Sequence, residues 1–487
     1  MNHLGKLSLR YLKIGLKNGL IAALIAGGGC DAMHHGQAGD ASVASAQAPA
    51  IPPLSADDVS LLFPAPTQAA DFAKLIAVGD LTSPNAQDPT KRDPVWSSDV
   101  FQQFVAIAGN PAFQVSGAPA VGLPPEAQTI GAWFIAGIRV DAGAPGLSSE
   151  IRAQFGQRPE IRLIIQPVTP NPDGTPNVHD LAGHLIFDFI LGTGPAPDGC
   201  SPPAVPDLVA FNTIVAELAT LRTKLANGKL GANKVVTAGL PLGVHPGLAD
   251  ATTAANLRLE IKSFLERHIS AKRLNAMAMT VIPPGKAAPW SFLAMINFHP
   301  GQFPPLPNGG VVPLPGPTLD GKLFAELLQP AGTPPPQPRV VPQPHTNNQN
   351  PITCRSAASP VPLPVAGRNG VSTSDIFAGT PLPGQVQTTV DVIADPTKSH
   401  FFNTDCVSCH TETRRSMDLS GVKTIPGIDT AALPNGQWDI RNFGWALAPK
   451  GAVQATVTRR TAAETAAVLS FINSQLPATP SLSATPH

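Results

Sequence analysis

AWFIAGIRV, residues 132–140, is a short run of branched, aromatic and small apolar side chains, with glycine before it and a glycine- and proline-containing stretch after it. Runs of this length and composition are typical of buried β-strands. Two more segments have the same character, IRLIIQPV at 161–168 and WSFLAMINF at 290–298. The sequence therefore predicts a sheet built from buried strands.

Two amphipathic helices are predicted between the second and third of these strands. Residues 207–227 place apolar side chains at spacings of three, four and seven, and Gly228 follows where a helix commonly ends. Residues 250–267 repeat the pattern. Mixed strands and helices in this order predict an α+β domain over residues 55–330.

Charge and composition exclude several classes of protein. The 33 basic and 33 acidic residues give a net charge of zero, and no basic run follows the first residues, so nothing indicates a nucleic-acid partner. With 55 prolines and 43 glycines the chain is rich in loops, yet 43% hydrophobic residues are enough for a folded core. Residues 331–394 are predicted to be an extended, proline-rich connector and 479–487 a disordered tail.

The first residues indicate export. A basic stretch precedes GLIAALIA at 19–26, which is too short to cross a bilayer, and small residues lead to Cys30. Residues 1–29 are therefore predicted to be a signal peptide. The order resembles a bacterial lipoprotein signal, which implies acylation of Cys30, a lipid anchor in a membrane on the periplasmic side, and a flexible tether over residues 30–54. Ordinary cleavage near Gly29, or at the small residues between Ala41 and Ala50, is the alternative.

CVSCH, residues 406–410, is the segment that indicates a cofactor. Two thiols two residues apart, followed directly by histidine, form the pattern to which haem is covalently attached. One helical turn presents both sulfurs to one edge of the porphyrin, and the next residue brings an imidazole under the iron. A redox or zinc Cys-X-X-Cys is the alternative, but it requires a second ligand pair or a thioredoxin-like context, and neither is visible.

The residues around this motif resemble a known family. CVSCH followed by Thr411 and Glu412 in a predicted helix, then a long loop and a terminal helix containing Phe471 and Ile472, is similar to class I cytochrome c. The resemblance implies a small, mostly α-helical haem module over residues 395–478. No family resemblance is evident in the region upstream.

The resemblance also assigns the cofactor and its ligands. It implies one covalently attached haem c per chain, bound through Cys406 and Cys409, with His410 as the proximal axial ligand of the iron. In that family a methionine before the last helix supplies the sixth ligand, but here no methionine follows Met417. A continuing helix would keep Met417 on the same side of the ring as His410, since it lies seven residues further on. The distal position is therefore open or filled by one of these candidates: Met417, Met295, His400, His299, Lys450 and His345.

Other residues near the motif have a functional and a structural interpretation each. Arginines at 414, 415 and 441 are able to neutralise haem propionates or to lie solvated on the surface. Aromatic residues at 438, 443 and 445 either wall the haem or pack in a core. His179 and His184 are five residues apart, which places them on different sides of a helix or strand, so they are not expected to share a metal.

The terminal helix and two cysteines complete the predictions from sequence. Thr461 and Glu464 have the spacing of a capping box at the start of a helix over residues 462–476. Once the motif and Cys30 are assigned, Cys200 and Cys354 remain. In an exported protein such a pair favours a disulfide; two buried thiols are the alternative.

Together these features predict an exported mono-haem c-type cytochrome lipoprotein that carries single electrons at the bacterial cell envelope and has a redox partner protein. One alternative is a peroxidase-like haem oxidoreductase, which the missing methionine favours because substrate binding needs an open iron site. The single attachment motif is against it, because peroxide cleavage usually requires a second haem or a distal acid–base pair. Another alternative is an envelope binding or scaffold protein in which the haem module is accessory.

Overall fold

The computed structural model describes residues 53–108, 123–144, 152, 156–193, 204–281, 291–298, 310–313, 383–398, 406–435, 441–447 and 452–475. All elements named below belong to one compact unit, Pro49–His487. The predicted signal peptide, Cys30, Cys200, Cys354 and the predicted tail lie outside the described residues. Within the described part of the chain, no helix is both long enough and apolar enough to span a bilayer.

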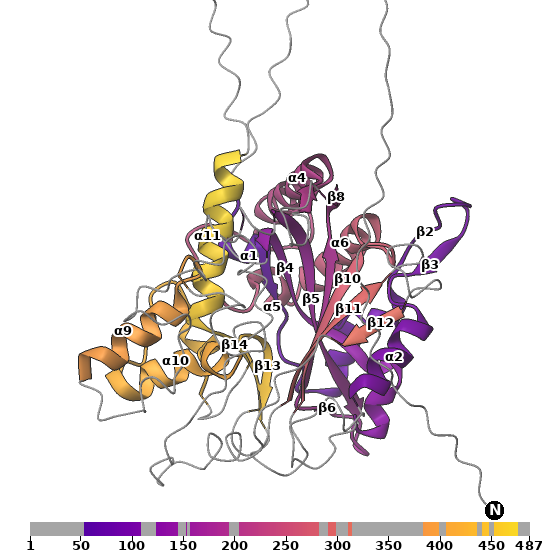
Figure 1. Ribbon diagram of the computed structural model, residues 1–487. Helices are drawn as coiled ribbons and strands as arrows, with labels where there is room; N and C mark the ends of the chain where they lie inside the picture. The colour runs from indigo at the N-terminus through magenta and orange to yellow at the C-terminus, as the bar shows by residue number, and fades with distance from the viewer. Residues whose placement is uncertain are drawn as a thin grey trace, which may run out of the picture. The chain divides into compact units, whose positions relative to one another are not determined.

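An eight-stranded antiparallel sheet is the centre of this unit (Figure 1). Its order is β1-β4-β5-β7-β10-β11-β12, and β6 pairs with β5 outside this path. The strands are β1 Ser60–Leu62, β4 Trp133–Ala144, β5 Arg158–Pro170, β6 Pro176–Val178, β7 Leu181–Asp188, β10 Leu274–Val281, β11 Ser291–Phe298 and β12 Gly310–Pro313. The three strands predicted from sequence are confirmed as β4, β5 and β11.

Shorter elements surround the sheet. The two-stranded pairs are β2 Thr82–Pro84 with β3 Arg92–Pro94, β8 Ile190–Thr193 with β9 Ala204–Pro206, and β13 Phe443–Leu447 with β14 Val453–Val457. The α-helices are α1 Ala56–Val59, α2 Ser98–Ala108, α4 Leu208–Ala226, α5 Pro246–Ala249, α6 Ala254–His268, α9 Pro383–Ala394, α10 Cys406–Ser420 and α11 Arg459–Gln475. The 3-10 turns are η1 Ala69–Lys74, η2 Val78–Asp80, η4 Pro125–Gln128, η5 Ile130–Ala132 and η8 Thr430–Ala432. This mixture confirms the α+β class predicted for the N-terminal region.

Local sequence explains where the two predicted central helices begin and end. Asp207 caps α4 by accepting the N–H of Ala210 at 3.0 Å, and Gly228 ends it in the left-handed region at φ 65°. Helix α6 begins four residues later than predicted. The Asp250 carboxylate accepts the N–H groups of Thr252 and Thr253, both at 2.9 Å, and holds these residues in a turn before the helix.

Two predictions about the C-terminal region are wrong. Residues 383–394 form helix α9 instead of the end of an extended connector, because no proline lies between Pro383 and Pro396 and because Val390 and Ile393 are buried at helical spacing. Helix α11 begins at Arg459, so Thr461 lies inside it and does not form a capping box with Glu464. The hydroxyl of Thr458 accepts the Thr461 N–H at 3.3 Å instead.

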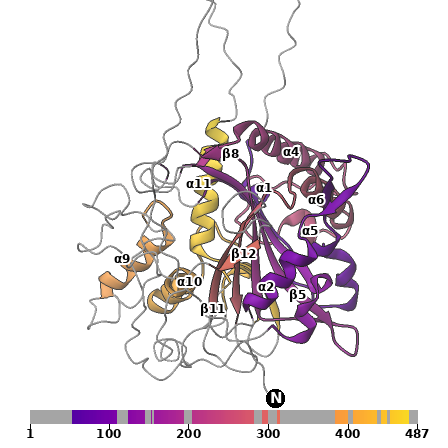
Figure 2. The ribbon, with the colours of Figure 1, turned by 45° about the vertical axis from the view of Figure 1, so that its right-hand side comes forward.

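The two faces of the sheet have different coverings. One, which we call the α2 face, packs on Trp133, Trp96 and Phe104, whose rings meet edge to face at centroid distances of 5.3 to 6.2 Å. The other, which we call the β13 face, is covered over β1, β4 and β5 by β13 and α11. Helices α9 and α10 lie side by side, with α11 between them and β4 (Figures 1 and 2).

The first and last described segments are joined directly. Leu54 donates its N–H to the side-chain oxygen of Asn473 at 3.0 Å and accepts from the Asn473 amide at 3.2 Å. The hydroxyls of Ser60 on β1 and Thr465 on α11 are 2.8 Å apart. The hydrophobic core is continuous from the sheet into the C-terminal segment, and includes Phe443, Trp445, Val468 and Ile472.

Candidate haem-attachment site

Helix α10 begins at Cys406, so the CVSCH motif forms its first turn. A spacing of three and four residues places positions 406, 409 and 410 on one side of a helix, as attachment to one porphyrin edge requires. The side chains of Cys409 and His410 are half-buried. The described residues of the motif therefore fit a covalently attached haem.

Two buried residues shortly after the motif, Glu412 and Thr413, fix α10 to α11. The Glu412 carboxylate accepts the Arg460 N–H at 3.1 Å, and the Thr413 hydroxyl accepts the Arg459 N–H at 2.8 Å. Thr413 in turn donates its hydroxyl hydrogen to Glu412. Burial raises the pKa of Glu412 to about 7. The first turn of α11 is thus capped by side chains from the helix that carries the CVSCH motif.

A buried ion-pair network joins α11 to the sheet. Glu464 accepts from Arg139 on β4 at 2.7 Å and from Arg460 at 2.6 Å. Burial alone would raise the pKa of Glu464, but these two cations lower it to about 2. Arg460 also donates to the Ile393 carbonyl at the end of α9, at 3.1 Å. The CVSCH motif is therefore connected to the β13 face through α11.

Strand β13 is fitted closely to β4 and β5. Gln166 donates to the Trp445 carbonyl at 2.8 Å and accepts the Trp445 N–H at 2.6 Å, and the indole N–H reaches the Phe63 carbonyl at 3.0 Å. The Phe443 ring packs so closely on Gly137 that a Cβ on this glycine would lie 2.7 Å from two of the ring carbons. Of the three aromatic residues predicted to wall the haem or a core, Phe443 and Trp445 lie in the core shared with the sheet, and Trp438 lies outside the described residues.

The arginines near the motif are held in different ways. Arg441, which is 3% exposed, donates to the Asp180 carboxylate at 2.7 Å, next to the start of β7. Arg414 is half-buried on α10. Arg459, which was not predicted from sequence, donates to the Ser416 hydroxyl at 2.8 Å and also pairs with Asp391 on α9. These contacts strengthen the joint between α9, α10 and α11.

The structure describes only some of the predicted distal ligands. Met417 is half-buried on α10, which continues without a break to Ser420, and packs at the edge of the core. Met295 is a residue of β11. His299, His345, His400 and Lys450 lie outside the described residues.

The two upstream histidines occupy separate places. His179 shares a hydrogen bond with the Thr169 hydroxyl at 2.8 Å, beside the β5–β6 pair. His184 lies on β7, where burial lowers its pKa well below the ordinary value, with the neighbouring Arg162 and His410 acting in the same direction. His410 of the CVSCH motif therefore lies near a residue of the sheet, which no motif in the sequence predicts.

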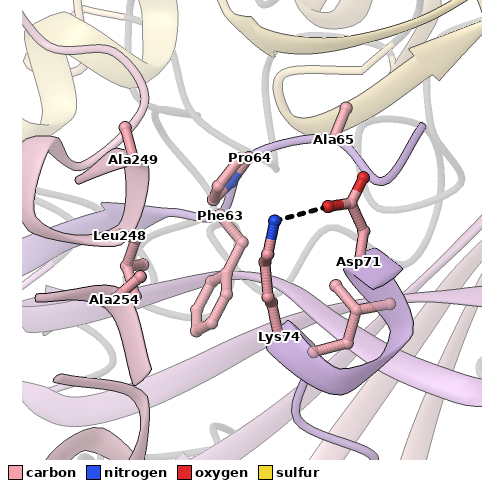
Figure 3. Close-up of a pocket in the computed structure, with 9 residues that line it drawn as sticks. Phe63, Pro64, Ala65, Asp71, Lys74, Leu248, Ala249 and Ala254 are labelled. Atoms are coloured by element: carbon pink, nitrogen blue, oxygen red, sulfur yellow. Dashed lines mark hydrogen bonds and ion pairs between the residues drawn. The ribbon is translucent and has the colours of Figure 1, made fainter. Parts of the chain in front are cut away.

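A cavity elsewhere in the described part of the chain has no cysteine or histidine in its lining. A cavity of about 210 Å³ lies between Phe63, Leu248 and the turn η1 (Figure 3). Its charged side chains, Asp71 and Lys74, pair with each other at 2.8 Å. The remaining lining is apolar, so the cavity presents no unsatisfied charge to a ligand.

No protein-family model, curated protein or solved structure matches the chain. Within the described residues, no group of three or more His, Cys, Asp or Glu side chains is arranged to hold a metal ion by itself. A haem iron needs only axial ligands from the protein, because the porphyrin provides the other four.

Proposed function

We propose that the chain is an exported mono-haem c-type cytochrome that carries single electrons at the cell envelope, with a lipid anchor at Cys30 and a redox partner protein. The observation that carries the proposal is the position of CVSCH in the first turn of α10, with Cys409 and His410 half-buried. This is the local geometry that attachment to two vinyl groups of one porphyrin needs.

The protein's own residues have two tasks in this proposal. Cys406 and Cys409 hold the porphyrin covalently, and His410 holds the iron from the proximal side. The capping contacts of Glu412 and Thr413 fix α10 on α11, which keeps the His410 imidazole in one orientation. A bound haem supplies an iron that cycles between the ferric and ferrous states and so accepts and releases one electron.

A peroxidase-like oxidoreductase is the second candidate function, and one observation favours it. Helix α10 is unbroken to Ser420, so Met417 stays on the helix that carries His410 and does not reach the opposite side of the ring. A sixth position without a methionine is either open to substrate or filled by a nitrogen ligand. A peroxidase-like enzyme requires the open position. An electron carrier is favoured by the nitrogen ligand, which keeps substrate away from the iron.

The test is expression of the full chain in a bacterium that attaches haem c in the periplasm. We expect haem that survives denaturation and acid extraction, and its loss in the double variant Cys406→Ala/Cys409→Ala. Ser408→Ala, which changes the motif at a position without a role in attachment, is the matched control and should keep its haem. Covalent haem in the double variant would refute the proposal.

Carbon monoxide binding and peroxide turnover then separate the two candidates. A carrier with a filled coordination sphere binds carbon monoxide slowly or not at all and does not turn over peroxide. Rapid binding together with peroxide turnover would favour the enzyme.

A further inference from the structure

The β13 face of the sheet is incompletely covered over β7 and β10. Cross-strand register places His184 between Ile164 on β5 and Ala278 on β10, with all three side chains on the same face. Ile164 is buried, since Gly444 of β13 lies against it. His184 and Ala278 keep partial exposure, whereas their neighbours on the α2 face, Leu185 and Met277, are at most 1% exposed.

On the β10 side, the neighbours of His184 are small. Along β7 the preceding residue on the same face is Ala182, and on β10 the adjacent positions of this face are Ala276 and Ala278. A methyl group is much shorter than an imidazole, so these alanines do not cover the His184 ring. A flat apolar ring is able to lie over such a surface with the histidine nitrogen pointing at its centre.

Hydrogen bonds and ion pairs connect helix α10 to this face of the sheet. The Glu412 carboxylate on α10 accepts the Arg460 N–H, and Arg460 pairs with Glu464 on α11. Glu464 pairs in turn with Arg139 on β4. Arg139 lies opposite Arg162 on β5, which is two residues from Ile164 and therefore on the same face.

His184 lies opposite Ile164 on that face. His410 and Arg162 are among the groups that lower the pKa of His184, which agrees with a position of the CVSCH motif near this part of the sheet.

The ring of His184 has no structural bond that would explain its position. Among the described residues, no side chain or backbone group is hydrogen-bonded to it, and the groups that act on it most strongly are cations. Two other histidines differ from His184 in this respect. His179 shares a hydrogen bond with the Thr169 hydroxyl, and His245 accepts the Gly247 N–H at 3.0 Å at the start of a helix. A partly exposed ring without such a partner keeps its nitrogen available to a ligand.

We propose that His184 is the second axial ligand of the haem iron, opposite His410. The proposal rests on the proposed function and deepens it, because it assigns the coordination position that the sequence leaves open. It makes the upstream α+β region part of the haem site. It also favours the electron carrier, because an iron held by two imidazoles has no vacant position for a substrate.

The test uses the full chain with covalently attached haem. Wild type is expected to be low-spin in both oxidation states, to lack the near-infrared methionine-to-iron band, and not to bind carbon monoxide. His184→Ala should keep its covalent haem but lose the low-spin spectrum and bind carbon monoxide stoichiometrically. Added imidazole should restore the low-spin spectrum. His179→Ala, the matched control, should behave as wild type.

The outcomes separate this proposal from the one on which it depends. A wild type without covalent haem overturns the proposed function and this inference with it. Covalent haem together with an unchanged low-spin spectrum in His184→Ala overturns the ligand assignment alone, as does a wild type that is high-spin. If His184→Ala does not accumulate, His184→Met decides: a new methionine-to-iron band supports the assignment, and an unaltered spectrum refutes it.

Discussion

Replacing Gly137 with alanine should destabilise the protein by forcing β13 away from β4. A Cβ at this position would lie 2.7 Å from two carbons of the Phe443 ring, closer than real Cβ contacts allow, and 3.5 Å from the Leu61 carbonyl. Overpacking of this kind costs about 1–3 kcal/mol. The lower backbone entropy of alanine in the unfolded chain offsets about 0.4–1 kcal/mol of that. We therefore expect a net loss of about 1–2 kcal/mol in the free energy of unfolding.

The assay is thermal unfolding of the full chain, followed by circular dichroism, for Gly137→Ala, Phe443→Leu and the double variant. Leucine shortens the side chain that the new methyl group meets. The double variant should therefore be less destabilised than the sum of the single variants, by about 0.5–2 kcal/mol. Gly131→Ala is the matched control, because a Cβ there would have no atom within 4 Å. It should unfold within a degree or so of wild type.

Additive effects of the two substitutions would refute this explanation. So would an unchanged midpoint for Gly137→Ala alone. Either result would mean that Phe443 does not lie against β4, and would remove the contact that seats β13 on the sheet.

Further predictions concern a buried acid, the anchor and two cysteines. Burial raises the pKa of Asp57 from 3.8 to about 7, so the folded state keeps a proton that the unfolded state loses between pH 4 and 7, and stability falls over that window as the pH rises. Asp57→Asn should remove that fall and be more stable than wild type at pH 8 by up to about 4 kcal/mol, whereas equal urea midpoints at pH 8 would contradict it. Cys30→Ala should release the protein from the membrane fraction, and a wild type that is already soluble after export would show that no lipid is attached. Peptides containing Cys200 and Cys354 should be recovered as a linked pair from a non-reduced digest, unless both thiols are alkylated without reductant.

Sequence predicted the elements whose signals are local. Strand β5 is a nearly continuous apolar run, and α4 has its own cap at Asp207 and its own terminating glycine at Gly228, so both were located to within a few residues. Strands β7 and β10 were missed. Each buries only one face completely, and Gly183 and His184 interrupt the apolar pattern of β7.

The start of α11 was misplaced for a different reason. Its first amides are capped by Glu412 and Thr413, which are more than forty positions away in the sequence. A spacing rule that reads only neighbouring residues selects Thr461 instead. The connection of the CVSCH motif to the sheet depends in the same way on strand register and on the β4–α11 ion pairs, which no local pattern encodes.

The joined ends of the described chain have a consequence for the order of folding. The Leu54–Asn473 hydrogen bonds connect residues 419 positions apart, and the Ser60–Thr465 contact spans 405. Bringing together residues this distant costs loop-closure entropy before any contact compensates for it. Strand β1 and the β4 side of the sheet therefore remain uncovered until α11 has been synthesised. A chain shortened before Arg459 would leave Arg139 without its carboxylate and β4 without its cover, so premature termination should yield an aggregation-prone protein instead of a smaller stable one.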